Sequence, residues 1–150
     1  MLKIDITTGD SVTPREIEYA FKLRFEDRTI SIMAYNLETV LAEKYETIIT
    51  RGVTNTRMRD FYDVYVLINT HAFDAKIFRT ALDKTAEKRG TTEQMSAGTM
   101  NTIDFIMENE VMADLWQKYQ KKYFYAADIS WVMVINAVKN LAEGSALEKR

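Results

Sequence analysis

Residues 36–60, NLETVLAEKYETIITRGVTNTRMRD, begin where the hydrophobic pattern of the chain changes from simple alternation to helical spacing. Apolar side chains recur after three or four residues, as at Leu41, Tyr45 and Ile48. This spacing places them on one face of an amphipathic helix. The stretch therefore predicts that a helical region starts here and that it follows a sheet.

Polar residues and a glycine mark where the helices of this stretch begin and end. Asn36 is a suitable N-cap, and Gly52 fits the position that follows the last turn of a helix. A second helix is expected at about residues 57–69, with Asn55 or Thr56 as its cap. The two helices are thus joined by a short link.

Upstream of residue 36, side chains alternate between apolar and polar, which is typical of strands. The alternating segments are Leu2–Thr8, Glu18–Glu26 and Thr29–Met33, and the last two are separated by a short polar turn. We therefore expect a small N-terminal sheet of about three strands, with a hairpin between the second and third.

Downstream of residue 69, helical spacing continues and few residues interrupt it. Asp74 is a suitable cap for the next helix, and Gly90 fits its end. Helices are expected at about residues 75–89, 102–108, 111–123 and 129–142, with a loop at 91–99 and a frayed end at 145–150. The predicted fold class is α+β, a single domain over residues 1–150 with its sheet portion at 1–35 and a helical bundle at 36–150.

Composition excludes several classes of site. The 150 residues are 47% hydrophobic and 28% charged, which is ordinary for a globular protein. There are no cysteines and one histidine, so thiolate metal sites, disulfides and multi-histidine metal sites are excluded. No apolar stretch is long enough to span a membrane.

Lys44 occupies a position where the helical spacing predicts an apolar residue. Its stem could lie along the rim of the core while the ammonium reaches water. Alternatively, the ammonium projects into a polar cleft, where it would bind phosphate as a point charge. Both interpretations stay open at this point.

The residues after Lys44 favour a polar site. Arg57 and Arg59 lie near the link between the two helices, and Asp60 and Asp63 follow them on one helical face. These groups could form surface ion pairs that contribute less than about 1 kcal/mol each. They could also form a site in which carboxylates orient cations that bind a polyphosphate.

Asp5 is a further candidate, because the alternation of its strand places it on the face opposite Ile4 and Ile6. A strand carboxylate beside phosphate-binding cations would be a suitable Mg²⁺ ligand. Exposure of the carboxylate on an open sheet is the alternative.

Five segments together resemble the abortive-infection (AbiEii/AbiGii) nucleotidyltransferase toxin family. They read LKIDITTGDSVTPREIEY, AYNLETVLAEKYETIITRG, NTRMRDFYDVYVL, TALDKTAEKRGT and LWQKYQKKYFYAADISW. The resemblance covers nearly the whole chain. It implies a minimal nucleotidyltransferase fold followed by helices, with Mg²⁺ and an NTP substrate. It also implies nucleotide transfer to tRNA by a cytoplasmic phage-defence toxin whose antitoxin is a separate transcriptional repressor.

The same resemblance implies roles for individual residues. Lys44 and Arg51 would belong to the third family motif and face the nucleotide phosphates. Arg57, Arg59 and Asp60 would form the fourth motif, the arginines as phosphate ligands. Asp60 would orient Lys44 or the substrate.

The sequence departs from the family at its first motif. Family members begin with a Gly-Gly or Gly-Ser turn and an Asp-x-Asp metal pair, and no Asp-x-Asp occurs in this sequence. Asp5 would complete the metal site but cannot form a two-metal site alone. We therefore expect a truncated or degenerate form that does not catalyse transfer by itself. Its unpaired sheet edge would accept a missing N-terminal chain or a second copy.

Two other interpretations stay open. The chain could be a non-catalytic remnant that binds a nucleotide or a partner, or one half of a split enzyme. The basic and aromatic segment 116–125, WQKYQKKYFY, could contact single-stranded RNA. It is more commonly the pattern of an amphipathic helix with its lysines in solvent.

Overall fold

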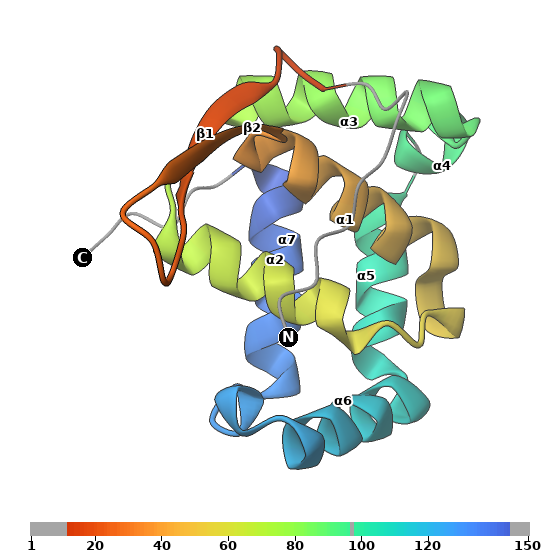
Figure 1. Cartoon of the computed structure of the whole chain (residues 1–150). Coiled ribbons are helices and arrows are strands. Elements are labelled where there is room, and N and C mark those ends of the chain that lie inside the picture. Colours follow the sequence, from red (N-terminus) through yellow and green to blue (C-terminus); the bar gives the residue numbers. More distant parts are fainter. Residues whose placement is uncertain (1–11, 97, 145–150) are drawn as a thin grey trace.

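The computed structural model describes residues 12–96 and 98–144 as two strands followed by a helical bundle (Figure 1). The strands are β1 (Ile17–Lys22) and β2 (Thr29–Ala34). The α-helices are α1 (Leu37–Arg51), α2 (Met58–Thr70), α3 (Ala75–Arg89), α4 (Thr92–Ser96), α5 (Thr99–Glu108), α6 (Glu110–Lys122) and α7 (Trp131–Glu143). Short 3-10 turns follow α1 (Gly52–Thr54) and α6 (Phe124–Ala126).

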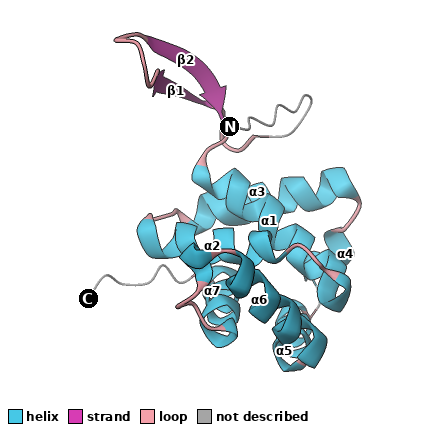
Figure 2. Ribbon diagram, turned by 60° about the horizontal axis from the view of Figure 1, so that its bottom comes forward, coloured by secondary structure: helices cyan, strands magenta, loops and turns pink. Residues whose placement is uncertain are grey.

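The predicted α+β class and the predicted hairpin are confirmed. β1 and β2 pair antiparallel, with Ile17 opposite Ala34 and Lys22 opposite Thr29. Figure 2 shows that this hairpin extends away from the helices. The described residues form a two-stranded sheet, and the first predicted strand, Leu2–Thr8, lies outside them.

The first strand of the hairpin ends earlier than predicted. The expected segment was Glu18–Glu26, whereas β1 stops at Lys22. The Leu23 N–H donates to the Arg28 carbonyl at 3.0 Å, which closes the turn from that point. Phe25 therefore lies in the turn, 94% exposed, although the alternation had placed it in the strand.

Helix α1 has both predicted ends. The Asn36 side chain accepts from the Thr39 N–H at 2.9 Å and so satisfies one of the free donors of the first turn. Gly52 ends the helix with φ 51°, a conformation that residues with a Cβ rarely adopt. The fully buried Leu41 and Ile48 point into the core, as the spacing predicts.

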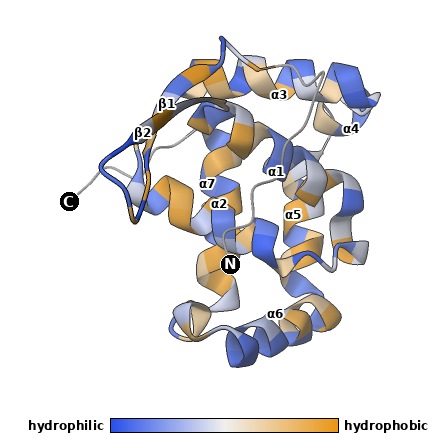
Figure 3. Cartoon of the chain, in the orientation of Figure 1, coloured by the Kyte–Doolittle hydropathy of each residue, from blue (hydrophilic) through white to orange (hydrophobic). Residues whose placement is uncertain are grey.

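Helix α1 crosses the middle of the bundle and packs against α2 and α3 (Figure 1). The Tyr45 and Phe78 rings meet edge to face between α1 and α3, with centroids 6.0 Å apart. The ring of Phe61 in α2 packs against the ring of Trp131 in α7, with centroids 5.3 Å apart. Apolar residues recur along these helices at the positions that face neighbouring helices (Figure 3). This packing fixes the helices that carry the polar residues discussed below.

The start of α2 differs in detail from the prediction, whereas α3 agrees with it. The N-cap of α2 is Arg57, which makes no side-chain cap bond, so neither Asn55 nor Thr56 is the cap. Asn55 instead accepts from the Arg57 N–H at 2.9 Å and fixes the backbone of the link. Asp74 caps α3 and Gly90 ends it, as predicted.

The second half of the bundle contains more helix than expected. The loop predicted at 91–99 is wrong, because α4 occupies Thr92–Ser96 and α5 already begins at Thr99. The small polar residues of segment 91–99 have no hydrophobic periodicity that would indicate a helix. Within the described part of the chain, no helix is both long enough and apolar enough to cross a membrane.

Replacing Asp74 with alanine is expected to lower the free energy of unfolding by about 1 kcal/mol. Its carboxylate accepts from the Lys76 N–H at 2.8 Å and from the Ile77 N–H at 3.0 Å, and both donors would lose this partner. Urea denaturation measures the change. Asp83→Ala, at an exposed position of the same helix, is the matched control. Equal effects of the two substitutions would contradict the capping role.

Candidate functional site

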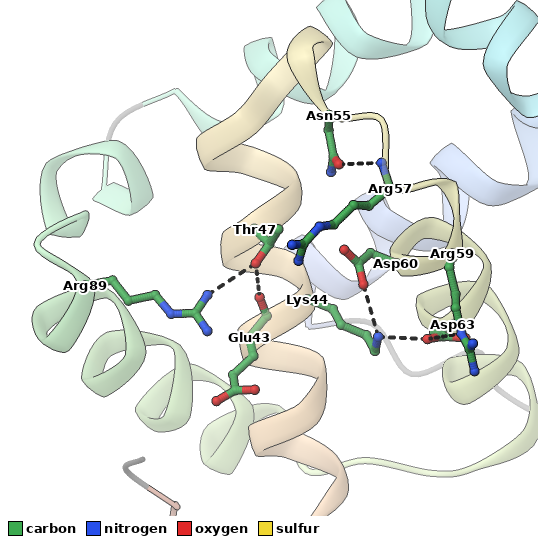
Figure 4. Close-up of polar contacts among 9 residues, drawn as sticks. All are labelled: Glu43, Lys44, Thr47, Asn55, Arg57, Arg59, Asp60, Asp63 and Arg89. Carbon is green, nitrogen blue, oxygen red and sulfur yellow. Dashed lines mark hydrogen bonds and ion pairs between the residues drawn. The ribbon is translucent and has the colours of Figure 1, made fainter. Parts of the chain in front are cut away.

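Lys44 points from α1 towards α2, where two carboxylates hold its ammonium (Figure 4). Its Nζ lies 3.2 Å from Asp60 Oδ1 and 2.7 Å from Asp63 Oδ2. The side chains are only 21%, 17% and 25% exposed for Lys44, Asp60 and Asp63. The ammonium is thus held in a polar pocket between two helices and does not extend freely into water.

The two acids reach Lys44 together because they are three residues apart on α2 and so share a face. Arg59 approaches the same cluster from outside, with Nε 3.7 Å from Asp63 Oδ2. Its side chain is 78% exposed, so this contact is a peripheral surface pair. The Lys44–Asp60–Asp63 cluster is therefore the partly buried centre of the site.

A cavity of about 290 Å³ lies beside this cluster, and we refer to it as the α1–α2 cavity. Its lining residues are Val40, Glu43, Lys44, Thr47, Arg57, Asp60 and Arg89. Arg57 extends from the link before α2 towards Lys44 and Asp60, whereas Arg89 reaches Thr47 from the end of α3 (Figure 4). Three cationic side chains from separate parts of the chain thus line one cavity.

Arg89 was not singled out from the sequence, and a buried carboxylate on α1 holds it. Glu46 is 3% exposed and forms an ion pair with Arg89. It also accepts hydrogen bonds from the hydroxyls of Thr50 and Thr91, each at 3.0 Å. Arg89 Nη1 lies 3.2 Å from Thr47 Oγ1, at the wall of the cavity. A glutamate at a buried helical position is the sequence signal that could have indicated a cationic partner.

The structure brings together some of the predicted site residues and separates others. Lys44, Arg57 and Asp60 line the α1–α2 cavity. Arg59 lies beside it, and the exposed Arg51 of α1 is not among the lining residues. Asp5 falls outside the described residues.

The described residues do not form a metal site. In residues 12–96 and 98–144, no group of three or more aspartate, glutamate or histidine side chains is placed to hold a metal ion. Asp60 and Asp63 both contact the Lys44 ammonium, which lies between them and offsets one of their two negative charges. Cation binding by this pair would require displacement of the lysine.

Comparison with known proteins gives the class of the molecule. A family model described as "Nucleotidyl transferase AbiEii toxin, Type IV TA system" matches residues 1–139. The chain therefore belongs to the AbiEii family of nucleotidyl transferase toxins from toxin–antitoxin systems, which confirms the resemblance seen in the sequence. No match to a curated protein or to a solved structure was found.

Replacing Lys44 with methionine is expected to lower the free energy of unfolding by about 1–3 kcal/mol, because two partly buried carboxylates lose their partner. Urea denaturation at neutral pH measures the loss. The triple variant Lys44→Met/Asp60→Asn/Asp63→Asn should recover much of it, since it removes the unpaired charges as well. Unchanged stability of the single variant would contradict a partly buried ion cluster.

Proposed function

We propose that the α1–α2 cavity binds the triphosphate of an NTP, and that the chain uses this site in nucleotide transfer to tRNA. The observation that carries the proposal is the convergence of Lys44, Arg57 and Arg89 on one cavity. Polyphosphates are bound in proteins by such combinations of lysine and arginine. Family membership supports the nucleotidyltransferase class, and the cavity supports the location.

Each cation offers different donors to the phosphates. The Lys44 ammonium has three N–H donors, and two of them serve Asp60 and Asp63. The remaining donor can serve a phosphate oxygen. The Arg57 guanidinium presents a planar set of donors that can bind two phosphate oxygens at once. Arg89 offers the donors of its other two nitrogens, because its Nη1 serves Glu46 and Thr47.

The carboxylates prepare this arrangement before a ligand arrives. Asp60 and Asp63 fix the Lys44 ammonium between α1 and α2, and Glu46 fixes Arg89 at the end of α3. Long cationic side chains otherwise lose rotamer freedom on binding, which weakens affinity. Asp60 is therefore assigned the orienting role that the family resemblance implies for it.

Transfer would join the acceptor hydroxyl oxygen to the α-phosphorus of the NTP, break the bond to the β-phosphate and release pyrophosphate. Enzymes of this class align such a displacement with divalent metal ions. The described residues do not supply those ligands, and Asp5 as an Mg²⁺ ligand stays a prediction. We therefore propose that activity requires an Asp-x-Asp strand contributed by a longer or separate polypeptide.

The hairpin edge is the proposed docking place for that strand, or for a second copy of the chain. The absence of Asp-x-Asp from the sequence also favours a second candidate, a non-catalytic nucleotide- or partner-binding protein. In either case we propose a cytoplasmic, phage-defence setting in which a separate transcriptional repressor is the antitoxin. Transfer to labelled tRNA by this chain alone, lost in Asp60→Ala, would contradict the requirement for a further strand.

Titration with ATP, CTP, GTP and UTP tests the triphosphate site by calorimetry. Arg57→Ala is expected to weaken binding of the preferred NTP about 10- to 100-fold, because a charge-assisted contact to phosphate is lost. Arg89→Ala should act in the same direction. Arg59→Ala removes the same charge two residues away, outside the cavity lining, and should leave NTP affinity within about twofold.

The same titration separates binding at this site from general attraction of anions. Equal losses in the Arg57 and Arg59 variants would contradict the proposed site, and so would the absence of NTP binding by the unmodified chain. The triple variant Lys44→Met/Asp60→Asn/Asp63→Asn tests whether the Lys44 ammonium binds NTP. It removes the ammonium without leaving two unpaired carboxylates in the site. It should bind NTP at least about 10-fold more weakly than the unmodified chain.

A further inference from the structure

A second cavity lies between the start of α2 and the second half of α6, and we refer to it as the α2–α6 groove. Its volume is about 480 Å³. Its lining includes Arg57, Arg59 and Asp60 from the start of α2, and Lys118, Tyr119, Lys122 and Tyr123 from α6 and its end. Arg57 and Asp60 line the α1–α2 cavity as well, so the two cavities share a wall.

The groove is strongly basic. Two arginines from the start of α2 face two lysines from α6, and Asp60 is the one carboxylate among its described lining residues. Asp60 is itself bonded to Lys44, behind the groove. Lys118 and Lys122 are four residues apart, so they share one side of α6. Like charges gathered from two helices repel one another, which indicates a surface arranged for an anionic partner.

Two of the residues that line the groove, Tyr119 and Tyr123, belong to a cluster of aromatic rings. Tyr119 and Tyr123 have ring centroids 4.7 Å apart, and Tyr123 stacks on Tyr125 at 5.4 Å with an interplanar angle of 25°. The Lys122 ammonium is 5.2 Å from the centre of the Tyr123 ring. Phe124, next in sequence, is 90% exposed. Tyr119 also packs against the hydrophobic core, so its ring has a structural role as well as a place in the groove lining.

The Tyr119 hydroxyl remains neutral in this setting. Burial raises the pKa of Tyr119 above its usual value, and its hydrogen bond with Tyr125 raises that pKa further. The two hydroxyl oxygens are 3.1 Å apart. The Tyr119 ring therefore adds an apolar face and a neutral hydroxyl to the groove without adding negative charge.

We propose that the α2–α6 groove binds a single-stranded segment of nucleic acid, with phosphates on the four cations and a base on Tyr123. This inference rests on the proposed function, because the shared wall would lead the end of that strand to the NTP in the α1–α2 cavity. Bases in a duplex have no free face, whereas an unpaired base can stack on an aromatic ring beside basic side chains. The groove is thus suited to an unpaired segment and not to a duplex.

Fluorescence anisotropy with a labelled, unstructured RNA of about eight nucleotides tests the proposal on the full chain. Lys118→Ala/Lys122→Ala should weaken binding about 10-fold or more at low salt. The slope of log affinity against log salt should fall by about 1.4 for these two phosphate contacts. Lys84→Ala/Lys121→Ala removes the same charge from α3 and from α6 outside the groove lining, and it should change both quantities little.

Two substitutions of Tyr123 test whether a base stacks on its ring. Tyr123→Leu should weaken binding about 5- to 100-fold, because the aromatic face is lost while apolar bulk is kept. Tyr123→Phe should retain the affinity. A duplex of the same sequence should bind more weakly than the single strand. The affinity for a single-stranded DNA of that sequence, compared with the RNA, shows whether the groove also recognises the ribose 2′-hydroxyls.

Equal binding by the lysine variants and their control, or equal binding of duplex and single strand, would overturn the proposal. Lys118→Ala/Lys122→Ala also separates this inference from the proposed function, because neither lysine lines the α1–α2 cavity and NTP affinity should stay within about twofold. Loss of NTP binding at the α1–α2 cavity with retained oligonucleotide binding would count against the NTP site alone. Retained NTP binding without oligonucleotide binding would overturn the groove alone.

Discussion

The ion cluster between α1 and α2 is the constraint on which the candidate site depends. Lys44 replaces an apolar residue on the inward side of α1, and the packing of α2 places Asp60 and Asp63 against it. A partly buried ammonium is tolerated only where carboxylates satisfy it. The same contacts that hold the two helices together therefore fix a cation at the edge of the α1–α2 cavity.

A second carboxylate extends this arrangement to α3. Glu46 lies on α1 two residues after Lys44 and points to another side of the helix, where it holds Arg89. One helix thus carries a lysine and a glutamate that each select a charged partner from a neighbouring helix. The wall shared through Arg57 then joins the proposed triphosphate site to the basic, aromatic groove along α6.

Local patterns in the sequence predicted the elements that have strong local causes. Asn36, Gly52, Asp74 and Gly90 mark helix ends through their own backbone and side-chain chemistry, and all four positions are confirmed. The short helix at 92–96 was missed, because no hydrophobic stripe identifies it. The anomaly at Lys44 indicated a site, but its two interpretations could not be separated without the packing of α2.

The remaining parts of the site depend on contacts between distant segments. Arg89 lies 43 residues from Glu46 in the sequence, and nothing in the sequence near Arg89 indicates that contact. The composition of residues 116–125 indicated a possible contact with RNA, but the lysines of α6 form a groove only because the start of α2 packs beside them. These residues can be recognised only from the packing of distant segments, because periodicity and capping patterns describe local structure alone.

The most direct test of the account is a structure of the chain with a non-hydrolysable NTP. We predict triphosphate oxygens within hydrogen-bond distance of the Lys44 ammonium and of the guanidinium groups of Arg57 and Arg89. The Lys44 contacts to Asp60 and Asp63 should be retained in that complex. A triphosphate bound elsewhere on the chain, with the α1–α2 cavity empty, would contradict the account.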